Sequence, residues 1–160
     1  MDYQAVTPSR SLVVTLEYGA GLAGELEAAA AAADLASARF VGAGAVEDAE
    51  IGYYDQDEFE YATVSFEEPL GMPVVQGMIA RVEESVPTGE QPPAEERPDD
   101  ETARRPEADI WGVFARPSGQ AIAGEVIEAT VFGGQVFVQG FEEPLGRERH
   151  DATGMDLLSP

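Results

Sequence analysis

The sequence predicts an α+β domain in which one early helix is followed by about seven strands, mostly joined by hairpins. Three observations support this class. An alanine-rich segment with helical spacing occurs once, near the N-terminus. Segments rich in β-branched and apolar residues follow at short intervals, separated by glycines, prolines and acidic turns. The chain has 160 residues, of which 44% are hydrophobic, and this suits a single domain with a substantial core.

The first elements are a strand and a helix. Residues 11–18 are rich in β-branched and apolar side chains, and the glycine-containing segment 19–21 ends this expected strand. A helix is expected at 22–35 because its alanine run has the highest helix propensity. The residues that follow helical spacing, and should therefore face a sheet, are Leu22, Leu26, Ala29, Ala30 and Ala33.

The remaining strands are predicted from apolar runs and from the glycines, prolines and acidic residues that separate them. They are expected at 37–45, 49–54, 59–66, 72–82, 110–115, 120–126 and 130–141. The acidic segments 47–48 and 55–58 are interpreted as turns between them. Residues 116–119 read Arg-Pro-Ser-Gly, which suits a type I turn. Gly133 and Gly134 predict a bulge or bend within the last strand.

One domain is expected at 11–143, preceded by a lead-in at 1–10 and followed by a polar tail at 144–160. Residues 83–107 contain five prolines, many acids and almost no apolar side chains. Such a segment cannot bury enough surface to offset the entropy of ordering it. It is therefore predicted to be a flexible acidic loop inserted between two strands.

Charge is the strongest compositional signal. The formal net charge is -22, and the nine basic residues are all arginine. This much like charge destabilises a compact state unless salt screens it, so the composition predicts a protein of a salt-rich, halophilic cell. No apolar run is long enough to span a bilayer, and the N-terminus lacks the features of a signal peptide, so the cytoplasm is the expected location. The absence of cysteine excludes disulfides and thiolate zinc sites.

Four stretches of the sequence are similar to a known family. They are the strand, glycine turn and alanine-leucine helix at 12–35; Phe-Val-Gly-Ala-Gly-Ala-Val at 40–46 with Asp-Ala-Glu-Ile-Gly-Tyr-Tyr-Asp at 48–55; Phe-Glu-Glu-Pro-Leu at 66–70 with Val-Gln-Gly-Met-Ile-Ala at 75–80; and Gly-Glu-Val-Ile-Glu-Ala-Thr-Val-Phe at 124–132. On these stretches the chain resembles the PPC family (plants and prokaryotes conserved domain), and its tail resembles those of haloarchaeal members.

The resemblance implies a mixed, largely antiparallel sheet flanked by helix, assembled as a homotrimer. It also implies the family description, predicted DNA-binding protein. Many prokaryotic members carry histidines that form a metal site, and the matching positions here are Asp109, Trp111 and Glu125. These three are therefore candidate ligand-binding residues. Because every imidazole is missing, no metal or other cofactor is expected, although Asp109 and Glu125 could offer oxygen ligands to a hard cation.

The other candidate functional residues have weaker support from the sequence. His150 is the only histidine, lies in a charged tail, and is interpreted as a surface residue rather than part of a catalytic triad. Glu128 lies within an apolar strand and needs either a cleft or a partner, for which Arg39 is a candidate. A structural ion pair is favoured there over a functional role.

These observations favour a non-catalytic, oligomeric module that binds a small ligand or a protein partner. A DNA-associated transcriptional or chromatin regulator that acts with a partner is an alternative. Direct DNA binding is disfavoured because the affinity of proteins for DNA depends on a basic surface, which this chain lacks. An enzyme with a carboxylate-based site between subunits is a third hypothesis.

Overall fold

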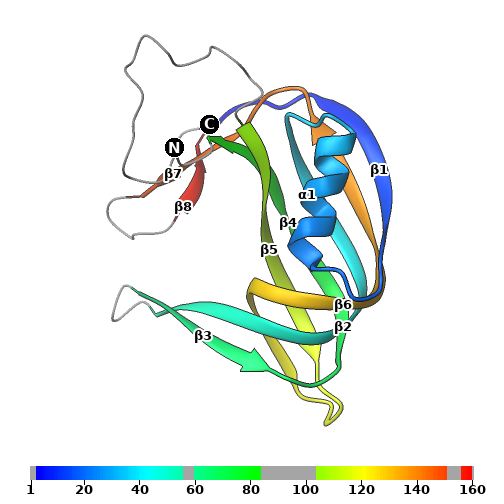
Figure 1. The fold of residues 1–160 in the computed structure, drawn as a ribbon. Helices are drawn as coiled ribbons and strands as arrows, with labels where there is room; N and C mark the ends of the chain where they lie inside the picture. Colours follow the sequence, from blue (N-terminus) through cyan, green and yellow to red (C-terminus); the bar gives the residue numbers. More distant parts are fainter. Residues whose placement is uncertain (1–2, 56–59, 84–103, 151–155, 160) are drawn as a thin grey trace, which may run out of the picture.

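A computed structural model describes residues 3–55, 60–83, 104–150 and 156–159 of the chain (Figure 1). The elements in chain order are β1 (Pro8–Leu16), α1 (Leu22–Ala32), β2 (Ser37–Asp55), β3 (Glu60–Phe66), β4 (Leu70–Glu83), β5 (Arg104–Ala115), β6 (Ala121–Phe141), β7 (Gly146–Arg149) and β8 (Asp156–Ser159).

The main sheet has six strands in the order β1-β6-β5-β4-β2-β3, and β6 also pairs with β2. These pairings join β2, β4, β5 and β6 into a closed ring. A second sheet consists of β7 and β8. The predicted α+β class with a largely antiparallel sheet and one flanking helix is confirmed. The expectation of a mixed sheet is not met, because every strand pairing of the described residues is antiparallel.

Two predicted strand pairs are continuous strands in the structure. Residues 37–45 and 49–54 both belong to β2, and 120–126 and 130–141 both fall in β6, apart from Gln120. The predicted turn at Glu47 and Asp48 is instead a register irregularity, and another lies next to Gly133, where a bulge or bend is expected. A bulge bends a strand and increases its twist without ending its pairing. The acidic residues and glycines at these positions therefore indicate a bend in a continuous strand rather than a turn that reverses the chain.

Other boundaries also differ from the expected ones. Helix α1 ends at Ala32 rather than Leu35, and Asp34 follows with a positive φ of 51°, a conformation that stops helices. Strand β5 begins at Arg104, so residues 104–107 of the expected acidic loop pair with β4. Glu83, the first residue of that loop, belongs to β4, whereas residues 84–103 and most of the expected turn at 55–58 lie outside the described residues. Strand β1 starts within the expected lead-in, and β7 and β8 fall within the expected tail.

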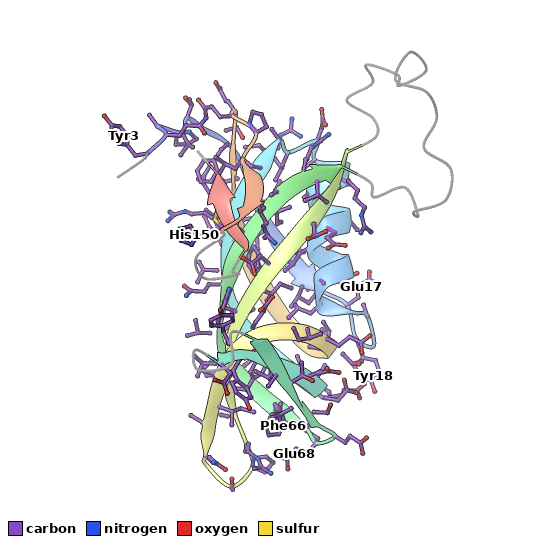
Figure 2. All side chains as sticks on the ribbon, turned by 90° about the vertical axis from the view of Figure 1, so that its left-hand side faces the viewer. Tyr3, Glu17, Tyr18, Phe66, Glu68 and His150 are labelled. Carbon is purple, nitrogen blue, oxygen red and sulfur yellow. The ribbon has the colours of Figure 1, made fainter. Side chains whose placement is uncertain are left out.

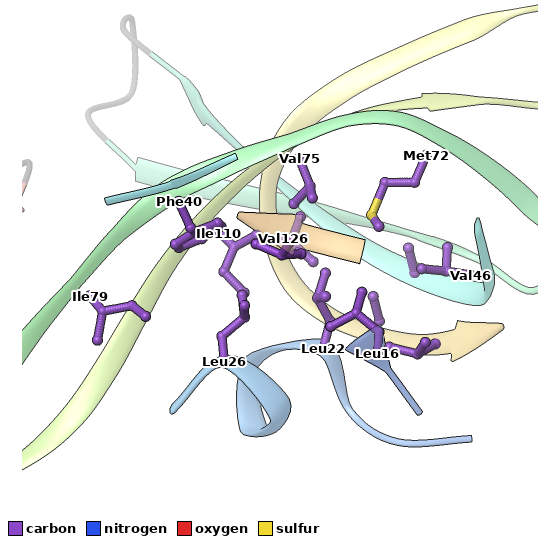
Figure 3. Close-up of a cluster of buried hydrophobic side chains, with 14 of the residues drawn as sticks. Leu16, Leu22, Leu26, Phe40, Val46, Met72, Val75, Ile79, Ile110 and Val126 are labelled. Carbon is purple, nitrogen blue, oxygen red and sulfur yellow. The ribbon is translucent and has the colours of Figure 1, made fainter. Parts of the chain in front are cut away.

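The core lies between α1 and the inner face of the sheet. Leu22, Leu26 and Ala30 of α1 are buried, as their spacing predicts, whereas Ala29 and Ala33 remain partly exposed. Figure 3 shows the two leucines beside side chains of the surrounding strands, among them Val75 and Ile110. The hairpin of β7 and β8 lies on the opposite side of the sheet from α1 (Figure 1). Within the described part of the chain, no helix has the length and hydrophobicity needed to cross a membrane.

Candidate functional site: the outer face of the sheet

The face of the sheet that points away from α1 is called the outer face here. One row of directly opposed residues crosses β1, β6, β2, β4 and β5, and it consists of Val13, Phe137, Val41, Gln76 and Trp111. Their neighbours along the strands, such as Val136 and Val75, point into the core, since successive strand residues alternate between faces. The apolar members of the row are exposed: Val13 by 69%, Val41 by 51%, Phe137 by 46% and Trp111 by 38%.

A second pair of apolar residues extends this surface. Val74 and Val113 are opposed across β4 and β5 and are also exposed. We call the six residues Val13, Val41, Val74, Trp111, Val113 and Phe137 the apolar belt. Contiguous apolar surface of this kind commonly marks a binding site, whereas single exposed apolar residues need no explanation.

A groove of about 370 Å³ crosses the centre of the outer face. Its lining residues are Arg39, Phe40, Val41, Gln76, Gly77, Met78, Trp111, Phe137 and Gln139. None of these residues is acidic, although the chain contains 31 acidic residues. The groove therefore differs in charge from the average surface of this molecule.

Arg39 is the only basic residue of the groove, and it is exposed. Within the described part of the chain, no hydrogen bond or ion pair involves its guanidinium group. Every other arginine whose side chain is described has a partner within the protein. These partners are the carbonyl oxygen of Ala33 for Arg10, Asp34 for Arg81, Glu107 for Arg105, Glu68 for Arg116 and Asp109 for Arg147. The charge of Arg39 is thus available for a group from outside the chain.

The candidate residues Asp109, Trp111 and Glu125 lie together on the outer face, on β5 and β6. Trp111 on β5 is directly opposite Glu125 on β6, and Asp109 precedes Trp111 by one strand repeat on the same face. The carboxylate of Asp109 lies 3.4 Å from Nη2 of Arg147, whose side chain is only 16% exposed. The structure thus brings the three residues together and places a cation beside one of them.

This arrangement does not fit a metal ion. Tryptophan supplies no ligand atom, and the carboxylate of Asp109 already contacts the guanidinium group of Arg147. Among the described residues, no group of three histidine, cysteine, aspartate or glutamate side chains is placed to hold a metal. We therefore assign no metal chemistry to these positions.

The other candidate pair, Glu128 and Arg39, is not brought together. Arg39 is opposite Gln139 near one end of β2, and Glu128 is opposite Glu50 toward the other end. Glu128 instead lines an acidic hollow of about 420 Å³. The residues around this hollow are Glu47, Asp48, Ala49, Glu50, Ser65, Phe66, Glu67 and Glu128. It concentrates like charge in one place, which makes it a source of repulsion.

His150, Glu68 and Glu143 have structural surroundings. His150 is exposed and lies beside the hairpin of β7 and β8, far from Phe66 at the other end of the molecule (Figure 2). Glu68 forms an ion pair with Arg116. Glu143 accepts hydrogen bonds from the backbone N–H and the hydroxyl of Thr7, and these bonds lower the pKa of its carboxyl group.

Sequence reasoning missed most of the groove. The alternation of Val136 and Val138 with Phe137 and Gln139 was a usable signal, because it places Phe137 and Gln139 on one face of β6. Gln76, Met78 and Arg147 gave no comparable signal. Their positions depend on pairing between strands that are distant in sequence.

Comparisons with known proteins agree with this architecture. A metal-containing protein of Archaeoglobus fulgidus has 24% sequence identity and a TM-score of 0.80, with 100% of both chains covered. A plant- and prokaryote-conserved (PPC) protein of Pyrococcus horikoshii has 17% identity and a TM-score of 0.77 over 100% of this chain and 98% of its own. A provisionally named DNA-binding protein of Ralstonia eutropha has 21% identity and a TM-score of 0.72 over 92% and 90%. These similarities show the fold.

No match was found among curated proteins. The family model of the Plants and Prokaryotes Conserved (PCC) domain matches residues 3–142, which include β1 to β6 and the whole outer face. The chain therefore belongs to the Plants and Prokaryotes Conserved (PCC) domain family, the same family as the PPC domain named above.

Proposed function

We propose that this protein is a non-catalytic binding module that assembles as a homotrimer through the apolar belt. The observation that carries the proposal is the row of residues that crosses five strands at one level of the sheet, in which four side chains are apolar and exposed and the fifth is Gln76. Three copies is the number that the family resemblance implies.

The composition of the chain strengthens this argument. A net charge of -22 keeps most of the surface hydrated, yet no acidic side chain interrupts the row from Val13 to Trp111. The buried centres of protein interfaces are depleted in charged residues and enriched in aromatic ones. The belt has this composition, with Trp111 and Phe137 as its large anchors.

The assembly is tested by light scattering in about 2 M KCl, where repulsion between copies is screened. The wild-type protein should have the mass of three chains. Val41→Glu places a charge at the centre of the belt and should shift the mass to that of one chain. Val64→Glu is the matched control, because Val64 is similarly exposed but lies on β3, outside the belt. A monomeric wild type, or equal effects of both substitutions, would contradict the proposal.

A DNA-associated regulator that acts with a partner is a second candidate, and the name of the Ralstonia neighbour favours it. Direct binding is disfavoured because proteins gain affinity for DNA by neutralising phosphates, whereas this chain has 31 acidic and nine basic residues. We expect no gel shift of duplex DNA by the protein alone at about 0.1 M salt, where phosphate contacts are still strong. A clear shift without a partner would favour this second candidate.

A further inference from the structure

We infer that the groove on the outer face binds a small anion with a flat apolar ring, and that Arg39 holds the anionic group. This inference rests on the proposed binding function and names the class of ligand for the same face. It follows from the charge, the walls and the size of the groove.

The charge of the groove selects an anion. Arg39 is the only described arginine side chain without a protein partner, and no acidic residue lines the groove. A guanidinium group can form two parallel hydrogen bonds to a carboxylate or phosphate, and such charge-assisted pairs are stronger than neutral hydrogen bonds. In a molecule of net charge -22, this is a local site of opposite sign at which an anion can be held.

The walls of the groove select a flat apolar body. Trp111 and Phe137 line opposite sides of it, on β5 and β6, and the opposed residues Val41 and Gln76 lie between them on β2 and β4. Three inter-strand steps separate Trp111 from Phe137, which corresponds to about 14 Å along the sheet. A ring system can therefore lie flat on Val41 while its edges contact the two aromatic side chains.

The charged group lies at one end of the groove. Arg39 lies opposite Gln139 and Met78, one strand repeat away from the row that contains Val41. Gln76 adds an amide group that can donate a hydrogen bond to an oxygen atom, whereas the amide of Gln139 already donates to the carbonyl oxygens of Ser9 and Gly140. A ligand with its ring over Val41 and its anionic group toward Arg39 would match this placement of the charge.

The size of the groove favours a small molecule over an acidic side chain from a second copy. Its volume of about 370 Å³ lies within the range of small-molecule sites. A single aspartate or glutamate could pair with Arg39 but would leave the space between Trp111 and Phe137 largely unfilled. If the belt is covered by assembly, the ligand would lie between subunits and be shielded from water.

The test uses the full chain and naphthalene-2-carboxylate as the probe, with naphthalene-2-carboxamide as the uncharged analogue. Trp111 is the only tryptophan of the chain, so its indole N–H gives one assignable NMR signal inside the groove. We expect a saturable shift of this signal with the carboxylate and binding at least about tenfold weaker with the carboxamide. 2-Naphthyl phosphate tests whether phosphate is accepted equally well.

Two arginine variants separate the role of Arg39 from a general effect of charge. Arg39→Gln should weaken binding of the carboxylate at least about tenfold, to the level of the carboxamide. Arg10→Gln removes the same charge from an exposed side chain that contacts only the carbonyl oxygen of Ala33, and it should bind the probe like the wild type.

The same samples are measured by light scattering, so that the two proposals fail separately. A trimer without a saturable shift of the Trp111 signal would refute the ligand and leave the assembly intact. A monomer that binds the probe would refute only the assembly. Equal binding by the wild type and Arg39→Gln would overturn the role of Arg39. Dissociation of the trimer by Arg39→Gln would show that its partner is a second copy of the chain, which also overturns the inference.

Discussion

At the scale of single residues, Gly77 shows how closely the strands beneath the groove are packed. A Cβ atom at this position would lie 1.8 Å from the carbonyl oxygen of Asp109 and 2.7 Å from Cζ of Phe40. The first atom belongs to the paired backbone of β5, and the second to a buried ring, so neither can move freely. Only glycine therefore permits the close approach of β4 and β5 beneath the groove.

Gly77→Ala should lower the free energy of unfolding by about 1–3 kcal/mol, because it overpacks a paired strand. Gly24→Ala is the matched control, since a Cβ on Gly24 would meet no atom within 4 Å and the residue lies in α1. There alanine should stabilise the protein by up to about 1 kcal/mol. Urea unfolding measures both changes, and a neutral or stabilising Gly77→Ala would show that the strands can separate at little cost.

Glu143 predicts a dependence of stability on pH. The carboxylate of Glu143 accepts hydrogen bonds from the backbone nitrogen of Thr7 at 2.6 Å and from the hydroxyl of Thr7 at 2.7 Å. These bonds favour the ionised form and lower the pKa of Glu143 below the ordinary 4.5. A group with a lowered pKa in the folded state stabilises the protein fully above its unfolded pKa, and this contribution disappears as the pH falls through the folded value.

The melting temperature of the wild type should therefore exceed that of Glu143→Gln near neutral pH, and the difference should shrink below about pH 4.5. Thr7→Val removes the hydroxyl donor and should reduce the part of the difference that depends on pH. Thermal unfolding from neutral to acidic pH measures both effects. A difference in melting temperature that stays constant over this range would mean that Glu143 stabilises the protein through its packing and not through the ionisation of its carboxyl group.

At the scale of elements, the sequence predicts what local patterns determine. The position of α1 follows from the spacing of Leu22 and Leu26, and most strands follow from β-branched runs. The continuity of β2 and β6 could not be predicted, because a bulge and a turn use the same glycines and acids. The family resemblance singled out Asp109, Trp111 and Glu125 as candidate ligand-binding residues, and the structure places the three on one face. The groove depends on the register of β2, β4, β5 and β6, which no local pattern specifies.

The pairing of β7 with β8 was also missed, and one arginine joins β7 to the main sheet. Nη2 of Arg147 lies 3.4 Å from Asp109, its Nη1 lies 3.8 Å from Glu107, and its side chain is only 16% exposed. Within the described part of the chain, Nη2 is buried without a hydrogen bond that satisfies it. The attraction between charges, rather than hydrogen bonding, is therefore its main favourable contact with β5.

Arg147→Gln should release β7, since it removes this attraction and leaves two carboxylates side by side. We expect the backbone amides of β7 to exchange with deuterium roughly tenfold faster or more, while those of β2 and β6 stay unchanged. Arg105→Gln is the matched control, because Arg105 contacts the same Glu107 at 3.9 Å but is 66% exposed, and exposed pairs contribute little. Equal exchange in both variants would show that β7 is held by other contacts.

At the scale of the whole molecule, charge is distributed unevenly. The acidic hollow collects Glu47, Asp48, Glu50, Glu67 and Glu128, and Glu50 and Glu128 are directly opposed across β2 and β6. Like charges opposed on a sheet destabilise it. The groove of the outer face, in contrast, is lined by no acid. The groove is thus spared the repulsion between like charges that the acidic hollow concentrates.

This distribution predicts how salt affects folding. A net charge of -22 opposes compaction until ions screen it, and the screening length is already about 10 Å at 0.1 M salt and about 3 Å at 1 M. The melting temperature should therefore rise steeply over the first few tenths molar KCl. Molar concentrations of a salting-out salt such as potassium phosphate should raise it further, because such salts strengthen the burial of apolar surface.

Glu50→Gln combined with Glu128→Gln tests the source of the salt dependence. Removing the opposed pair should stabilise the protein by about 0.2–1 kcal/mol in dilute buffer, and the gain should fade in molar salt, where the repulsion is already screened. Thermal unfolding by circular dichroism against KCl measures both proteins. A melting temperature that is the same in dilute buffer and in molar salt would refute the prediction that the protein is adapted to salt. A gain that persists undiminished in molar salt would mean that the two carboxylates do not destabilise the fold through repulsion between their charges.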